Sequence, residues 1–190
     1  MFYFICVFNF RFNFVYVDIE GIGTFIAYIG AFSALFAAVI ATRQQDIKKI
    51  LAYSTMSQLG YMFIAVGLGF YSSGLFHVFT HAFFKAMLFM GAGGMIIALH
   101  HEQNIFKMAQ HRVHTPIIGF CMLVGVIAIS GIPPFSGFFS KDAILAAAFQ
   151  EGQYIIWGIA MFTAFLTAFY MFRLYFIVFV APSPEPKKYV

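Results

Sequence analysis

Long apolar runs separated by short polar segments dominate the chain. A helix needs about 20 apolar residues to cross roughly 30 Å of hydrocarbon, and only helices satisfy their own backbone hydrogen bonds in lipid over such lengths. The pattern therefore predicts an all-α fold, a polytopic transmembrane helix bundle with about five spans. The predicted spans are residues 24–41, 50–70, 73–99, 117–149 and 154–180.

The span at 117–149 differs from the others because it contains helix-breaking residues. Pro133 and Pro134 lack backbone donors and clash with the preceding turn, and Gly131 and Gly137 flank them. We predict one broken helix, with irregular backbone around 131–138 that faces protein or water, as broken backbone in a membrane must. The alternative is that the prolines end the span and the Lys-Asp pair that follows belongs to a surface loop.

The chain divides into three parts by composition. Residues 24–180 form the predicted five-helix unit, and residues 181–190 form a polar, proline-rich tail. Residues 1–23 form an N-terminal segment that is either an extra span or a surface helix, and Arg11 weakens the case for a span.

The charged residues support the membrane interpretation and predict on which side of the membrane each loop lies. Hydrophobic residues make up 62% of the chain and charged residues 9%, well below the roughly 25% of a soluble domain. With five spans, the three basic segments lie on one face, and the positive-inside rule places that face on the matrix or cytoplasmic side. The net charge of +4 thus indicates orientation in a lipid bilayer and does not predict nucleic-acid binding. The basic segments are 42–49, 100–115 and the tail.

A line of titratable residues runs through the span at 73–99. His77, His81 and Lys85 are spaced four residues apart, so they share one helix face and cover about 12 Å along the axis. Ionisable residues inside a membrane are costly and mark ion or proton pathways, and histidine titrates near neutral pH. Together with Lys141 and Asp142 in the broken span, they predict a proton relay.

These residues also fit other interpretations. A buried histidine is often a hydrogen-bonded core residue. His77 and His81 have the spacing of two zinc ligands, but no cysteine or carboxylate near them in that span completes a zinc site, so we predict no metal. The sequence also lacks a phosphate-binding glycine loop, a CxxC pair and a nucleophile elbow. We therefore predict no cofactor in this chain.

Four motifs carry a resemblance to a known family. DIKKILAYSTMSQLGYM (46–62), FHVFTHAFFKAMLFM (76–90), HHEQNIFKM (100–108) and GIPPFSGFFSKDAIL (131–145) resemble subunit 5 of NADH:ubiquinone oxidoreductase, respiratory complex I. The resemblance extends over about 24–180. The first and third motifs are shared more widely with antiporter-like proteins, and HHEQNIFKM together with GFFSKD points to subunit 5.

The resemblance implies a function and an assembly. The family's members translocate protons in the membrane arm and contain two inverted five-helix units, each with a lysine in a broken helix. It implies that His77, His81 and Lys85 form the relay line and that Lys141, with Asp142 beside it, is the lysine of the second unit's broken helix. NAD, FMN, iron–sulfur clusters and ubiquinone are expected on other subunits. The mitochondrial inner membrane, or a bacterial plasma membrane, is the expected location.

The chain departs from the family in what it lacks. The span count matches the second five-helix unit, whereas the first unit and a long lateral helix are missing, and residues 1–17 do not match. We therefore expect membrane-arm partner subunits, including a chain that supplies the first unit. We also expect that the gene is either split or shortened. Two alternatives stay open: a subunit of a multisubunit sodium/proton antiporter, and a structural remnant of the membrane arm.

Overall fold

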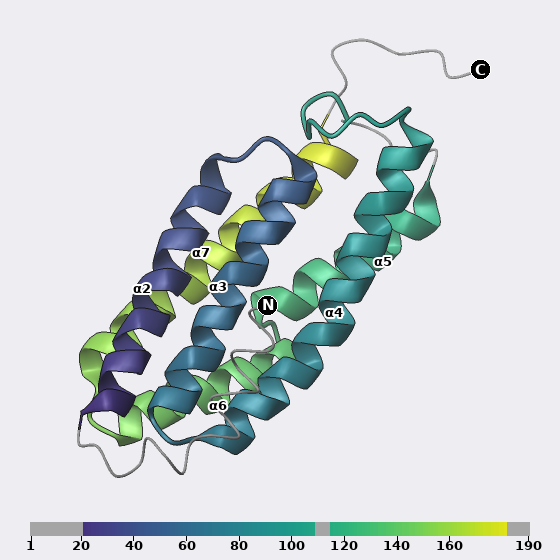
Figure 1. The fold of residues 1–190 in the computed structure, drawn as a ribbon. Helices are drawn as coiled ribbons and strands as arrows, with labels where there is room; N and C mark the ends of the chain where they lie inside the picture. Colours follow the sequence, from purple (N-terminus) through teal and green to yellow (C-terminus); the bar gives the residue numbers. More distant parts are fainter. Residues whose placement is uncertain (1–20, 109–114, 182–190) are drawn as a thin grey trace.

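The computed structural model describes residues 21–108 and 115–181, and these residues form a bundle of helices (Figure 1). The predicted N-terminal segment up to residue 20 and the tail from residue 182 lie outside the described residues. The all-α prediction is confirmed, since each predicted span corresponds to a helix or to a pair of half-helices. The helices are α2 (Ile22–Arg43), α3 (Ile47–Gly67), α4 (Tyr71–Ala98), α5 (Pro116–Ser130), α6 (Ser136–Gln150) and α7 (Tyr154–Phe179).

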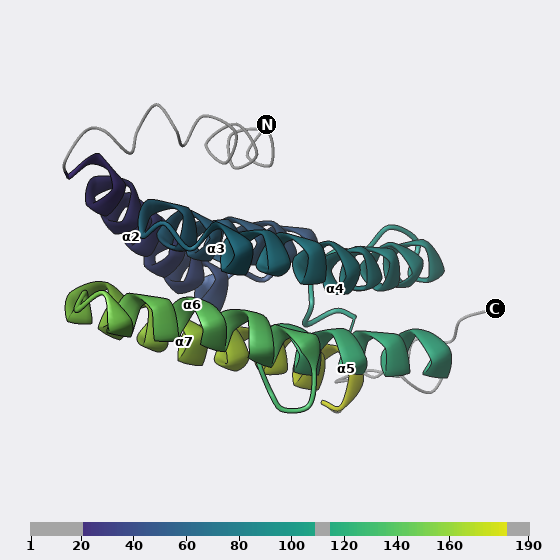
Figure 2. The ribbon, with the colours of Figure 1, turned by 90° about the horizontal axis from the view of Figure 1, so that it is seen from below.

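The helices form two layers. Figure 2 shows α2, α3 and α4 in one layer and α5, α6 and α7 in the other. The layers meet where α2 packs on α7 and where α4 packs on both α5 and α6. Among the described helices, α2, α3, α4 and α7 are long and apolar enough to cross a membrane. Exposed phenylalanines cover the outer faces of α2, α4 and α7, as expected for side chains that face lipid tails.

The predicted broken helix is present between α5 and α6. Each half has 15 residues, which at about 1.5 Å per residue is too short to cross the hydrocarbon core alone. Gly131 follows the last residue of α5 and has a left-handed φ of 77°, and Ile132 N donates to the Ile127 carbonyl, as in a Schellman cap. The two halves together therefore make one crossing.

Close approach of α2 and α3 depends on small residues. Buried alanines line the α2 face, and a Cβ built on Gly30 would lie 2.8 Å from the Gly60 carbonyl oxygen. Backbones can come this near only where side chains are absent, which is the usual way that membrane helices pack without a hydrophobic driving force.

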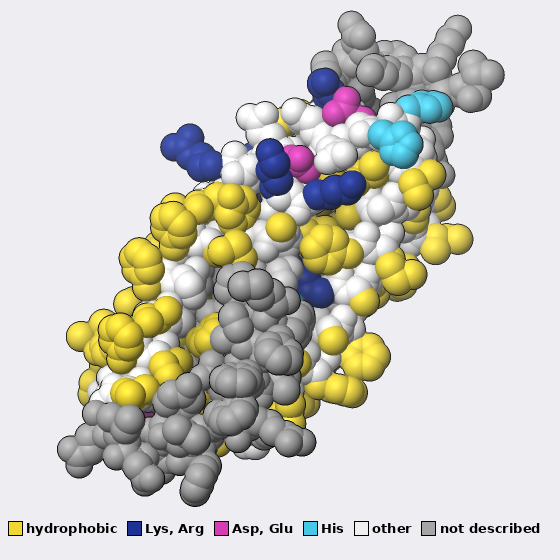
Figure 3. All heavy atoms as spheres, viewed as in Figure 1, with side chains coloured by type: hydrophobic (Ala, Val, Ile, Leu, Met, Phe, Trp, Pro, Cys, Tyr) yellow, Lys and Arg dark blue, Asp and Glu magenta, His cyan; other side chains and the backbone are white. Residues whose placement is uncertain are grey.

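The α2–α3 turn and the loop after α4 meet at one end of the bundle. Ile47 N donates to the Gln103 carbonyl at 3.0 Å, and Ile105 N donates to the Gln45 carbonyl at 2.9 Å. From α7, Arg173 donates to the Gln44 carbonyl at 3.0 Å. Most charged side chains visible in Figure 3 gather at this end, and the flanks are apolar. Two of the predicted basic segments therefore share one end of the molecule.

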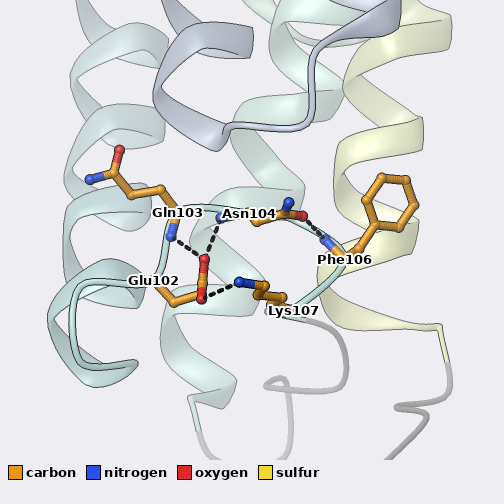
Figure 4. Close-up of polar contacts among 5 residues, drawn as sticks. All are labelled: Glu102, Gln103, Asn104, Phe106 and Lys107. Carbon is orange, nitrogen blue, oxygen red and sulfur yellow. Dashed lines mark hydrogen bonds and ion pairs between the residues drawn. The ribbon is translucent and has the colours of Figure 1, made fainter.

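The loop after α4 is held by its own side chains (Figure 4). The Glu102 carboxylate accepts the backbone N–H groups of Gln103 and Asn104 at 3.2 and 3.1 Å, and it pairs with Lys107 at 3.4 Å. Asn104 Oδ1 accepts Phe106 N–H at 3.0 Å. These contacts fix the segment that closes over the start of α3.

Candidate proton-relay site

Helix α4 turns its three titratable residues toward the centre of the bundle. His77 and His81 are fully buried and Lys85 is 5% exposed, whereas Phe79 and Phe83 on the other face are exposed. The two imidazole rings lie 6.2 Å apart, centre to centre. The four-residue spacing read from the sequence therefore becomes a single inward line, which satisfies the requirement that charge avoid lipid.

His77 connects two neighbouring helices. Its Nε2 lies 3.2 Å from Gln58 Oε1 on α3, and its Nδ1 lies 2.9 Å from Ser140 Oγ on α6. An amide oxygen only accepts hydrogen bonds, so with the Gln58 amide in this orientation Nε2 donates and Nδ1 accepts from the Ser140 hydroxyl. In this tautomer the unprotonated nitrogen, Nδ1, faces the broken helix.

Thr80 supports the same junction. Its Oγ1 lies 3.1 Å from the His77 carbonyl oxygen and 3.3 Å from Ser140 Oγ. A hydroxyl has one proton to donate, so Thr80 can donate to either oxygen in turn. The Thr80 and Ser140 hydroxyls can therefore reorient while His77 stays in place.

Lys141 on α6 binds the end of the other half-helix. Its side chain is 3% exposed, and Nζ donates to the Ile129 carbonyl at 2.6 Å. In an unbroken helix this carbonyl would accept the N–H of residue 133, but Pro133 has none. The carboxyl end of α5 also carries partial negative charge. The proline pair therefore creates the acceptor that holds the lysine.

Glycine makes the crossing of the two half-helices possible. A Cβ on Gly137 would overlap the Ala128 carbonyl oxygen, so α6 begins in direct contact with the last turn of α5. This contact brings Lys141 within reach of Ile129. The Tyr61 ring lies 5.7 Å from the Lys141 ammonium, and the Tyr61 hydroxyl donates to the Ala160 carbonyl at 2.6 Å.

Lys85 is held by a backbone carbonyl as well. Its Nζ donates to the Leu51 carbonyl on α3 at 3.1 Å and lies 5.9 Å from the centre of the Phe89 ring. The ion pair seen in the described part of the chain is Glu102–Lys107, and neither buried lysine has a carboxylate partner there. The charge on these lysines is therefore stabilised by carbonyl dipoles and ring faces.

Helix α3 contributes polar residues that the sequence reading did not assign to the site. Ser54, Ser57, Gln58 and Tyr61 are all fully buried, and Tyr170 on α7 donates to Ser54 Oγ at 2.9 Å. Ser57 Oγ and Gln58 Nε2 make no hydrogen bond in the structure. Their spacing of three or four residues within an apolar span was the available signal, since it places them on one helix face.

Asp142 does not join the buried cluster. Its side chain is exposed, because successive residues on a helix point about 100° apart and Lys141 points inward. The structure thus brings together His77, His81, Lys85 and Lys141 and leaves the fifth predicted residue on the outer face of α6. In the described residues, no group of three or more His, Cys, Asp or Glu side chains could hold a metal ion.

The sequence is similar to known proteins over most of its length. Residues 2–167 match the family described as NADH:quinone oxidoreductase/Mrp antiporter, TM. This match includes residues 2–17, so the expectation that residues 1–17 do not match the family is wrong. Chain 5 of NAD(P)H-quinone oxidoreductase from Synechocystis is 51% identical over 81% of this chain, and subunit L of NADH-quinone oxidoreductase from Escherichia coli is 49% identical over 81%. These alignments cover 24% and 25% of the relatives, so the chain spans about a quarter of their length.

Solved structures give the same result at the level of the fold. The Mrp complex of a Dietzia species matches with a TM-score of 0.75 and 25% identity, over 83% of this chain and 30% of that one. A chain of the archaeal membrane-bound sulfane sulfur reductase matches with a TM-score of 0.77 and 29% identity, over 90% and 37%. The resemblance to subunit 5 of complex I is confirmed, and the chain belongs to the NADH:quinone oxidoreductase/Mrp antiporter transmembrane family.

Proposed function

We propose that this chain is a proton-translocating unit of the membrane arm of an NADH:quinone oxidoreductase. The observation that carries the proposal is the hydrogen-bonded junction of His77 with Ser140, which joins the α4 line to the helix that bears Lys141. The sequence relatives at about 50% identity are oxidoreductase subunits, whereas the Mrp structure is 25% identical. This difference favours the oxidoreductase over a sodium/proton antiporter.

The relay in this proposal follows the order Lys141, Ser140, His77, His81, Lys85. The Ser140 oxygen takes a proton from the Lys141 ammonium as its own hydroxyl proton passes to His77 Nδ1, so Ser140 stays neutral and Lys141 is left as an amine. His77 is then an imidazolium, and it returns to the neutral form by giving a proton, through water, to His81, whose ring lies 6.2 Å away centre to centre. His81 passes the proton on in the same way to Lys85, which accepts it as an amine. Each lysine rests on a carbonyl, Ile129 or Leu51, that can hold its ammonium form without a fixed counter-ion.

Control of the relay comes from outside this unit. An ionised lysine at mid-membrane costs about 2.5–3.5 kcal/mol on insertion scales. Among the described residues, no carboxylate forms an ion pair with Lys85 or Lys141 that would offset this cost. An acidic residue on a neighbouring membrane-arm subunit, including the chain that supplies the first five-helix unit, would change the charge of Lys85 or Lys141. Redox chemistry with NAD, FMN, iron–sulfur clusters and ubiquinone belongs to other subunits. The complex sits in the mitochondrial inner membrane or a bacterial plasma membrane, with the basic loops on the matrix or cytoplasmic side.

The test is NADH-driven proton uptake by membrane vesicles that contain the assembled complex. Lys85→Ala and Lys141→Ala should lower the number of protons moved per electron while assembly is retained. Phe165→Ala is the matched control, because that α7 side chain faces outward. An unchanged proton-to-electron ratio in both lysine variants would refute the relay. The same chain alone in liposomes should not conduct protons, since its controlling acid is absent.

A further inference from the structure

Asp142 is in an unusual position for an acidic residue. It lies eight residues before the end of α6 at Gln150, which is about 12 Å along the helix axis and places it near the middle of a hydrocarbon core of roughly 30 Å. Asp142 also lies six residues after the start of α6 at Ser136, and in the described helices it is the exposed acidic or basic side chain that lies more than one turn from both ends of its helix. The short aspartate side chain cannot reach the membrane surface from this depth.

The surface around Asp142 is unsuited to lipid for a second reason. Phe139, Asp142 and Ala146 line one outward face of α6, and α6 runs in front of α7 in Figure 2. The connection between the half-helices is exposed nearby, at Ile132, Pro133 and Pro134. Non-helical backbone and ionisable side chains at membrane depth require cover by protein or by a water-filled cavity.

We infer that this face of α6 is an interface with another membrane-embedded polypeptide that carries a basic side chain opposite Asp142. Charge complementarity selects the partner's chemistry, since an unpaired carboxylate at this depth is unfavourable and a lysine or arginine neutralises it. The chain spans about a quarter of its relatives' length, so in those proteins much more polypeptide is available to cover such a unit. The inference concerns the outside of the bundle and holds whether or not the buried residues conduct protons.

Photo-crosslinking in the intact membrane complex tests where the partner lies. A photoreactive phenylalanine analogue is placed at Phe139 and at Ala146, with Phe165 on α7 as the control that faces outward elsewhere. Positions 139 and 146 should both crosslink to one apolar segment of another polypeptide, and sequencing of the crosslinked peptide should find a Lys or Arg within one helical turn. Lipid adducts alone, a crosslink to a second copy of this chain, or a partner segment without a basic residue would each overturn the inference.

Charge variants test the pairing itself. Asp142→Asn keeps the shape of the side chain and should weaken co-purification of the crosslinked partner modestly, whereas Asp142→Lys should reduce it by about tenfold or more through like-charge repulsion. Changing the partner's basic residue to aspartate should restore binding to the Asp142→Lys chain. Equal recovery of the partner with all Asp142 variants would contradict the pairing. Rapid labelling of Asp142→Cys by a membrane-impermeant thiol reagent would also contradict it, because it would show a water-filled face.

Discussion

Removing the Ser140 hydroxyl tests whether the two titratable segments are joined. In Ser140→Ala, His77 Nδ1 loses its hydrogen-bond donor at 2.9 Å, and the fully buried ring is left with an unpaired nitrogen. Such an orphaned buried group costs about 1–3 kcal/mol. If the same hydrogen bond carries the proton, the barrier rises by a similar amount, and each 1.4 kcal/mol is about a tenfold change in rate.

We therefore expect Ser140→Ala to slow proton transfer through this unit by about tenfold to a hundredfold. The assay is NADH-driven proton uptake in vesicles, measured alongside NADH oxidation so that the proton-to-electron ratio is obtained. Ser136→Ala is the matched control, since Ser136 is an exposed serine one turn earlier on the same helix. Ser140→Thr keeps a hydroxyl and should retain more proton uptake than Ser140→Ala. A full ratio and rate in Ser140→Ala would refute the proposed junction.

Three further predictions concern neighbouring features. Gln58→Ala leaves His77 Nε2 without its acceptor and should destabilise the fold by about 1–3 kcal/mol and slow proton uptake, whereas Met56→Ala, at an exposed position on the same helix, should do neither; thermal unfolding in detergent and the uptake assay separate these outcomes. Gly137→Ala forces a methyl group onto the Ala128 carbonyl and should lower stability by about 1–3 kcal/mol, so an unchanged melting temperature would contradict the tight crossing of α5 and α6. The amide N–H of Asn104, with smaller contributions from Gln103 and Lys107, lowers the pKa of Glu102 below its ordinary value of 4.5. The ionised Glu102 carboxylate therefore stabilises the loop fully above that value, and this stabilisation is lost as pH falls through the lower folded-state pKa. Hydrogen exchange of the loop amides should show the loss in the native chain and not in Glu102→Gln.

Sequence alone predicted the architecture because the membrane imposes strong rules. Apolar length fixes the spans, and the proline pair fixes the break, since neither effect depends on which helices are neighbours. The inward direction of His77, His81 and Lys85 was predictable for the same reason. Exposing those side chains to lipid would be costly whatever the packing.

The partners of these residues could not be read from the sequence in the same way. Ser140 and Gln58 are neutral side chains that a membrane helix tolerates, and they meet His77 from 63 and 19 residues away. The Ile129 carbonyl was foreseeable in part, because a proline at 133 leaves the carbonyl four residues earlier free. Which side chain would bind that carbonyl depended on how α6 crosses α5.

Asp142 shows the limit of reasoning from adjacency. The sequence grouped it with Lys141 because the two are neighbours, yet neighbours on a helix point in different directions. The structure places it on the outer face, where its chemistry concerns a partner.

The central claim is that Lys85 and Lys141 act in one relay, and a double-mutant cycle tests it most directly. The measurement is the proton-to-electron ratio of the assembled complex with Lys85→Ala, Lys141→Ala and both changes together. Residues that act as a unit are strongly non-additive, so the account predicts that the double variant moves no fewer protons per electron than either single variant. Losses that add in the double variant, or a full ratio in either single variant, would contradict it.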